Sequence, residues 1–112
     1  MSEKLQPTPR KVLIVEDSRD WRDNFSEEFN REGVEVVIVG SPDEAKELLK
    51  KGGFTEVITD GLGGKWKDVA DSATDLPVRL VTNDSSLEHE AKIMGIGYVD
   101  KTDLDAWRNI AK

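Results

Sequence analysis

The chain has 112 residues, no cysteine and a formal net charge of −7. The lack of cysteine excludes disulfides, thiolate metal sites and cysteine nucleophiles. The acidic balance argues against nucleic acid as a direct partner and against an anionic membrane surface. The first residues contain no apolar run long enough for a signal peptide or a membrane span, so we expect a cytoplasmic protein with no membrane partner.

The composition predicts one folded domain. Hydrophobic residues make up 37% of the chain, with three Trp and three Phe, which is enough for a core despite 35% charged residues. Residues 1–10 hold two of the four prolines and few apolar groups. We therefore expect a flexible lead-in at 1–10 and a single domain at 11–112.

A strand and a helix are predicted first. Residues 11–15 are continuously apolar once Lys11 is passed, a pattern that is typical of a strand buried on both faces. Ser18 is suited to cap the helix that follows, and Gly33 to end it. Aromatic residues recur at every fourth position of this helix and predict a narrow core-facing stripe: Trp21, Phe25 and Phe29.

The same alternation of strand and helix continues. Residues 34–39 predict a second strand, and Ser41 predicts a helix start with Pro42 at the first helical position and Glu44 completing a capping box. A third strand, within 54–59, stops at Asp60 and a glycine-rich turn. Residues 65–75 have few apolar side chains to bury, so their helix should be short or irregular.

Two further strands complete the predicted pattern. Residues 78–82 form the fourth strand, after which Ser85 with Glu88 is expected to open a helix. Residues 97–99 form a short fifth strand, and Thr102 is expected to cap the last helix. Five strands alternating with helices predict an α/β fold, a three-layer sandwich with a parallel sheet covered by helices on both faces.

Polar residues follow four of these strands at the point where each strand ends. Ligand sites of parallel sheets lie beyond the carboxyl ends of the strands, so these side chains should gather there: Glu16, Asp17, Asp60, Thr82 and Lys101. Three close carboxylates need a cation, and Mg²⁺ suits oxygen ligands and recruits phosphate. A carboxylate can then become an acyl phosphate, while Thr82 and Lys101 stabilise the transferred oxygens.

In order and strand position, these residues resemble the response regulator receiver domain of the chemotaxis-protein type. Its pattern is an acidic pair after strand one, matched by Glu16-Asp17, then a phosphoacceptor matched by Asp60, followed by Thr82 and Lys101. Tyr98 matches the aromatic switch position, and Leu62 the residue whose backbone carbonyl binds the metal. The resemblance covers nearly the whole chain and implies a flavodoxin-like sheet of order 2-1-3-4-5.

The resemblance implies a stand-alone phosphorylation switch in a two-component phosphorelay. A sensor histidine kinase or phosphotransfer protein would donate the phosphoryl group to Asp60 with Mg²⁺. Thr82 and Tyr98 would then shift together, and a downstream protein target would recognise the change. Apart from its own phosphorylation and dephosphorylation, no enzymatic activity is implied.

Two departures from the family pattern leave alternatives open. Gly61 to Lys65 replace a Met-Pro element and a full third helix, and Thr102 stands where a cis proline commonly follows Lys101. A cis bond here would cost about 3 kcal/mol, so we expect a trans bond with a shifted Lys101 or a strained cis bond. One alternative is a pseudo-receiver that binds a protein regardless of phosphorylation. The other is a small Mg²⁺-dependent phosphohydrolase, although no general base is evident.

Overall fold

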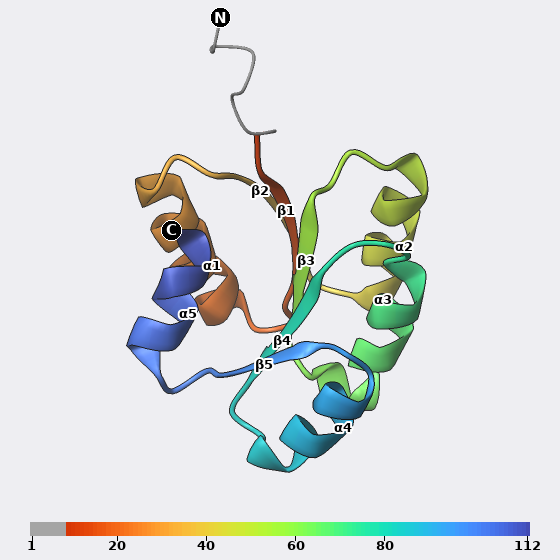
Figure 1. Ribbon diagram of the computed structural model, residues 1–112. Coiled ribbons are helices and arrows are strands. Elements are labelled where there is room, and N and C mark those ends of the chain that lie inside the picture. Colours follow the sequence, from red (N-terminus) through yellow and green to blue (C-terminus); the bar gives the residue numbers. More distant parts are fainter. Residues whose placement is uncertain (1–8) are drawn as a thin grey trace, which may run out of the picture.

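The computed structural model describes residues 9–112, and its centre is a parallel sheet of order β2-β1-β3-β4-β5 (Figure 1). The strands in chain order are β1 (Lys11–Val15), β2 (Glu35–Val39), β3 (Glu56–Thr59), β4 (Val78–Thr82) and β5 (Gly97–Asp100). The predicted α/β class and strand order are confirmed. Residues 1–8, most of the predicted lead-in, lie outside the described residues.

Helices cover both faces of the sheet, as predicted. On one face lie α1 (Arg19–Arg31) and α5 (Leu104–Ala111), and on the other α2 (Pro42–Lys51), α3 (Trp66–Ser72) and α4 (Glu88–Ile93) (Figure 1). The aromatic stripe of α1 packs against Trp107 of α5 in one core cluster. Within residues 9–112, no helix combines the length and the apolar character needed to cross a membrane.

The register of the central strands brings the predicted site residues together. Four of the five residues of β1 are fully buried, as the continuous apolar run predicted. Val15, the last residue of β1, pairs with Val39 on one side and with Thr59 on the other. The segments that follow β1 and β3 therefore leave the sheet side by side, with Glu16 and Asp60 as their first residues.

Two predicted helix starts are confirmed. The Ser18 hydroxyl accepts a hydrogen bond from the Trp21 backbone N–H at 3.4 Å. The Ser41 hydroxyl accepts one from the Glu44 N–H at 3.3 Å and donates to the Glu44 carboxylate at 3.1 Å. The short third helix is also as predicted, because α3 has seven residues.

Two other helix starts differ from the prediction. The cap of α5 is Asp103, whose carboxylate accepts from the Ala106 N–H at 3.1 Å, and not Thr102. Thr102 donates both its N–H and its hydroxyl to the carboxylate of Asp100, so its side chain is already engaged. Ser85 likewise is not a cap: Asp84 caps a 3₁₀ turn, Ser85–Leu87, and α4 begins only at Glu88.

Removing the observed cap of α5 should destabilise the fold more than removing the predicted one. Asp103→Ala leaves the Ala106 N–H without its acceptor, and we expect the free energy of unfolding to fall by about 1 kcal/mol. Thr102→Ala removes only a local bond to Asp100 and should cost less. Urea denaturation of both variants checks this, and a larger loss in Thr102→Ala would show that the cap is assigned to the wrong residue.

Candidate functional site

Three acidic side chains meet at the carboxyl end of the sheet. Glu16 and Asp17 follow β1 and Asp60 follows β3, and one carboxylate oxygen of each lies within 4.8 Å of the others. Glu16 is buried, Asp60 is partly buried and Asp17 is exposed. Hard divalent cations prefer such oxygen ligands. The donor set and spacing therefore fit the predicted Mg²⁺ site.

Lys101, the residue directly after β5, joins this acidic cluster. Its ammonium lies 2.7 Å from Glu16 Oε1 and 2.8 Å from Asp60 Oδ1, and the side chain is only 6% exposed. Residues 9–112 contain no cis peptide bond, so the bond between Lys101 and Thr102 is trans. The trans bond does not keep the ammonium away from either carboxylate.

Burial dominates the electrostatics of Glu16. Its side chain is 1% exposed, and this desolvation raises the pKa of the carboxyl above its ordinary value. The bonds from Lys101 and from the Ser18 N–H act in the opposite direction, and the nearby Asp60 charge raises the pKa further. The ionised Glu16 carboxylate is therefore in an unfavourable environment, and a bound divalent cation would stabilise its charge.

The raised pKa of Glu16 predicts a pH dependence of stability in metal-free protein. The Glu16 carboxyl binds its proton more tightly in the folded state than in the unfolded state. The stabilisation of the fold by this proton is therefore complete below about pH 4.5, the pKa of the carboxyl in the unfolded chain. It is lost as the pH rises through the higher folded pKa. We expect Glu16→Gln to flatten the unfolding free energy across this window, measured by urea denaturation in EDTA. An unchanged pH profile would contradict the shift.

An open pocket of about 280 Å³ lies beside Asp60. It is formed by the loops after β3 and β4: Asp60, Gly61, Leu62, Gly63, Gly64, Thr82, Asn83, Asp84 and Leu87. The Asp60 side chain is 16% exposed, so it can be reached from this pocket. Thr82 is buried and its hydroxyl accepts a bond from the Asp84 N–H at 3.2 Å. A carboxylate and a hydroxyl thus line one accessible space, and Lys101, which is not among the lining residues, contacts the same carboxylate.

Comparison with solved structures identifies this architecture. No protein-family model and no curated protein matches the chain. The Thermotoga maritima response regulator TrrA, solved in complex with Mg²⁺-BeF, matches with a TM-score of 0.74 at 22% identity, over 89% of this chain and 94% of that one. Chemotaxis protein CheY4 of Vibrio cholerae matches with a TM-score of 0.71 at 20% identity, over 92% and 94%. The chain has the receiver-domain fold.

The likeness extends beyond natural receivers and is a likeness of fold. A de novo designed Rossmann 2x3 protein matches with a TM-score of 0.71 at 15% identity, over 84% of this chain and 82% of that one. At such identities the roles of the side chains must come from this chain's own geometry.

The loop after Asp60 passes through left-handed backbone conformations. Leu62, Gly63 and Gly64 have φ values of 52°, 62° and 99°, and the first is a strained conformation for leucine. The Leu62 N–H donates to Asp60 Oδ2 at 3.1 Å, while its carbonyl accepts from the Lys65 N–H at 3.2 Å. The Leu62 carbonyl, which was predicted to bind the metal, thus already accepts a hydrogen bond within a turn. Its second lone pair is still available to an ion.

Tyr98 is packed inward in this receiver fold. It lies against a cluster of Trp66, Leu80, Ala91 and Ile96, and its buried hydroxyl has no hydrogen-bond partner among the described residues. Burial raises the pKa of Tyr98, with smaller contributions from Asp100, Glu88 and Asp84. The structure thus shows a packing contact, and the switch role of Tyr98 stays a prediction.

Two residues of the site were missed by the sequence interpretation. Arg22 donates to the Glu16 carbonyl at 2.9 Å, beside Gly40, where a Cβ would lie 3.2 Å from the guanidinium. Trp21 places its ring 4.7 Å from the Lys101 ammonium. Both lie in the first turns of the helix after the acidic pair, and this position was the only available signal.

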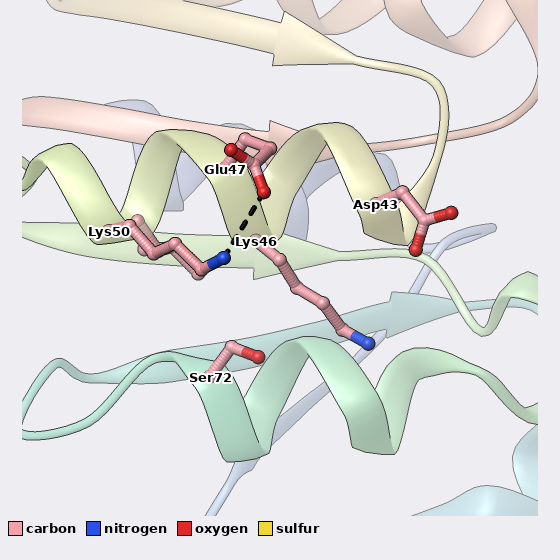
Figure 2. Close-up of a pocket in the computed structure, with 6 residues that line it drawn as sticks. Asp43, Lys46, Glu47, Lys50 and Ser72 are labelled. Atoms are coloured by element: carbon pink, nitrogen blue, oxygen red, sulfur yellow. Dashed lines mark hydrogen bonds and ion pairs between the residues drawn. The ribbon is translucent and has the colours of Figure 1, made fainter.

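A larger pocket lies away from this site, between α2 and α3. It has a volume of about 390 Å³ and is lined by Asp43, Lys46, Glu47, Leu49, Lys50 and Ser72 (Figure 2). Lys50 is paired with Glu47 at 3.2 Å, and both side chains are largely exposed. The lining contains two acids and two lysines and none of the predicted site residues, so it indicates no particular ligand.

Proposed function

We propose that this protein is a phosphoacceptor signalling domain that receives a phosphoryl group on Asp60. The observation that carries the proposal is the convergence of three carboxylates and one ammonium beside an open pocket: Glu16, Asp17, Asp60 and Lys101. Its receiver-domain neighbours, among them TrrA solved with Mg²⁺-BeF, support a role in two-component signalling.

Mg²⁺ would be held by Glu16, Asp17 and Asp60, with the remaining lone pair of the Leu62 carbonyl as a further ligand. When bound, it would neutralise the carboxylates and the phosphoryl oxygens. A carboxylate oxygen of Asp60 attacks phosphorus, forming a P–O bond as the bond to the donor's leaving group breaks and that group departs with the electron pair. Lys101 and Thr82 hydrogen-bond the transferred oxygens.

The chemistry of this domain would be limited to its own phosphorylation and dephosphorylation. The donor would be a sensor histidine kinase or a phosphotransfer protein, and the output a contact with a downstream protein. Sustained turnover of a small phosphomonoester in Mg²⁺ would contradict this limit and favour the phosphohydrolase alternative.

Intact mass after incubation with acetyl phosphate and Mg²⁺ tests the proposal. We expect the wild type to gain one phosphoryl group, and none in EDTA, because without a metal ion the three carboxylates outnumber the single Lys101 ammonium and repel an anionic donor. The acyl phosphate should be removed by hydroxylamine. A wild type that gains no phosphoryl group at saturating donor and Mg²⁺ would refute the proposal.

The loop after Asp60 favours a second candidate, a pseudo-receiver that binds a protein partner in one fixed state. Leu62 is only 8% exposed and its carbonyl is bonded within the turn, so the loop is committed to its present shape. This candidate predicts no Mg²⁺-dependent change in tryptophan fluorescence and no phosphorylation. Partner binding that is lost in Asp60→Ala would count against it.

A further inference from the structure

Lys101 is enclosed on three sides, and one of them is aromatic. Two carboxylate oxygens, of Glu16 and Asp60, lie 2.7 and 2.8 Å from its ammonium. The third neighbour is the Trp21 ring, whose centroid is 4.7 Å from the same nitrogen. A distance below about 6 Å from a desolvated ammonium is in the range of cation–π attraction, which is strongest for tryptophan.

The Trp21 ring is itself held in place by aromatic neighbours. It lies 5.7 Å from Phe25 on its own helix and 5.9 Å, edge to face, from Trp107 on α5. Phe25 and Trp107 are also in edge contact at 5.2 Å, so the three rings form a closed triangle. The ring cannot leave Lys101 without breaking contacts on two helices.

A ring suits this position better than a third hydrogen-bonding group would. A carboxylate would bind one N–H of Lys101, and water would compete for all three. The indole face attracts the charge without an acceptor atom, so the N–H groups remain directed at Glu16 and Asp60. Trp21 does not line the pocket beside Asp60, so it acts through Lys101, which contacts Asp60.

We propose that Trp21 is a positioning residue for phosphoryl transfer, holding the Lys101 ammonium over Asp60. The inference rests on the proposed function. It assigns Trp21 more than the packing of α1 on α5, because packing alone needs only an apolar side chain of similar size. The position of the ammonium then depends on an aromatic face at this residue.

Three variants separate positioning from packing. Trp21→Leu removes the aromatic face and keeps an apolar side chain, and Trp21→Phe keeps a ring. Phe25→Leu opens the aromatic triangle but leaves Trp107 in contact with the Trp21 ring, so the ring should stay against Lys101. All are compared at a temperature where circular dichroism shows them folded.

The first measurement is the NMR signal of the Lys101 Cε protons in metal-free protein without a donor. We expect an upfield ring-current shift in the wild type, in Trp21→Phe and in Phe25→Leu, and its loss in Trp21→Leu. The second is the rate of phosphorylation by acetyl phosphate with Mg²⁺. We expect Trp21→Leu to be about tenfold slower, the effect of a desolvated cation–π contact. Trp21→Phe should recover most of the rate, and Phe25→Leu should stay within about threefold of wild type.

Each result decides the inference. Equal Lys101 shifts in the wild type and Trp21→Leu would overturn it, as would a Trp21→Leu rate equal to the wild type or a Phe25→Leu rate as slow as Trp21→Leu. A wild type that gains no phosphoryl group would refute the proposed function and the catalytic part of this inference together. The Lys101 signal, recorded without donor or metal, would still show whether Trp21 holds the ammonium.

Discussion

Asp60→Asn is expected to abolish phosphorylation by acetyl phosphate. The amide has nearly the shape of the carboxylate, and its single oxygen can keep one of the two bonds that Asp60 accepts here, from the Leu62 N–H to Oδ2 or from Lys101 to Oδ1. A neutral amide oxygen is a far weaker nucleophile and metal ligand than a carboxylate. We therefore expect no detectable gain in intact mass under conditions in which the wild type is fully converted.

Asp84→Asn is the matched control for this loss. Asp84 lines the same pocket but is not part of the carboxylate cluster, and it accepts bonds from the Ser86 N–H and hydroxyl, which an amide oxygen can also accept. Phosphorylation should therefore persist in Asp84→Asn. A mass gain in Asp60→Asn equal to that of the wild type would place the phosphoryl group on another residue.

The features that the sequence predicted well depend on many residues acting together. The apolar run of β1 could be buried only in the middle of a parallel sheet, and the alternation with helices then determined the layers. Once the strands are parallel and in register, the residues after β1 and β3 must emerge side by side. Glu16, Asp17 and Asp60 meet for that reason, before any detail of their side chains matters.

The features that the sequence did not predict depend on competition between near neighbours. Asp100, Thr102 and Asp103 can all cap or close a turn, and the choice follows from where β5 ends, which leaves Asp100 to bind Thr102 and Asp103 to cap α5. The loop after Asp60 is similar, because local preference does not predict a leucine at φ 52°. That conformation is held by burial of the Leu62 side chain against the β1 core.

Trp21 shows a third limit of prediction from sequence. Its spacing with Phe25 and Phe29 predicted a core stripe, and Phe25 and Phe29 are indeed buried. Trp21, at the start of α1, is only partly buried: it packs against Trp107 and also contacts Lys101, a residue 80 positions later in the chain. Hydrophobic periodicity gives the buried side of a helix but not the tertiary partner of each side chain.

Lys101→Met is expected to lower the free energy of unfolding by about 3 to 5 kcal/mol in metal-free protein, the usual cost of removing one partner of a buried ion pair. Methionine keeps most of the apolar stem, so the loss comes from the charge. Without the ammonium, Glu16 and Asp60 face each other with no cation, and Glu16 is 1% exposed. Urea denaturation in EDTA measures the change, with Lys67→Met as control. Lys67 pairs with Glu90 where both side chains are 44% exposed, and such surface pairs contribute about 0 to 1 kcal/mol.

Adding Mg²⁺ should distinguish lost charge from lost packing in Lys101→Met. If Glu16, Asp17 and Asp60 bind the ion, the cation replaces the missing charge, and stabilisation at a hundred times the dissociation constant would be about 2.7 kcal/mol. The wild type should bind Mg²⁺ more weakly than the variant, because its ammonium already competes for Glu16 and Asp60. A variant that is destabilised but unresponsive to Mg²⁺ would mean that the carboxylates do not form a metal site. If Lys101→Met lowers the free energy of unfolding no more than Lys67→Met does, the buried contacts of Lys101 with Glu16 and Asp60 do not hold the site together.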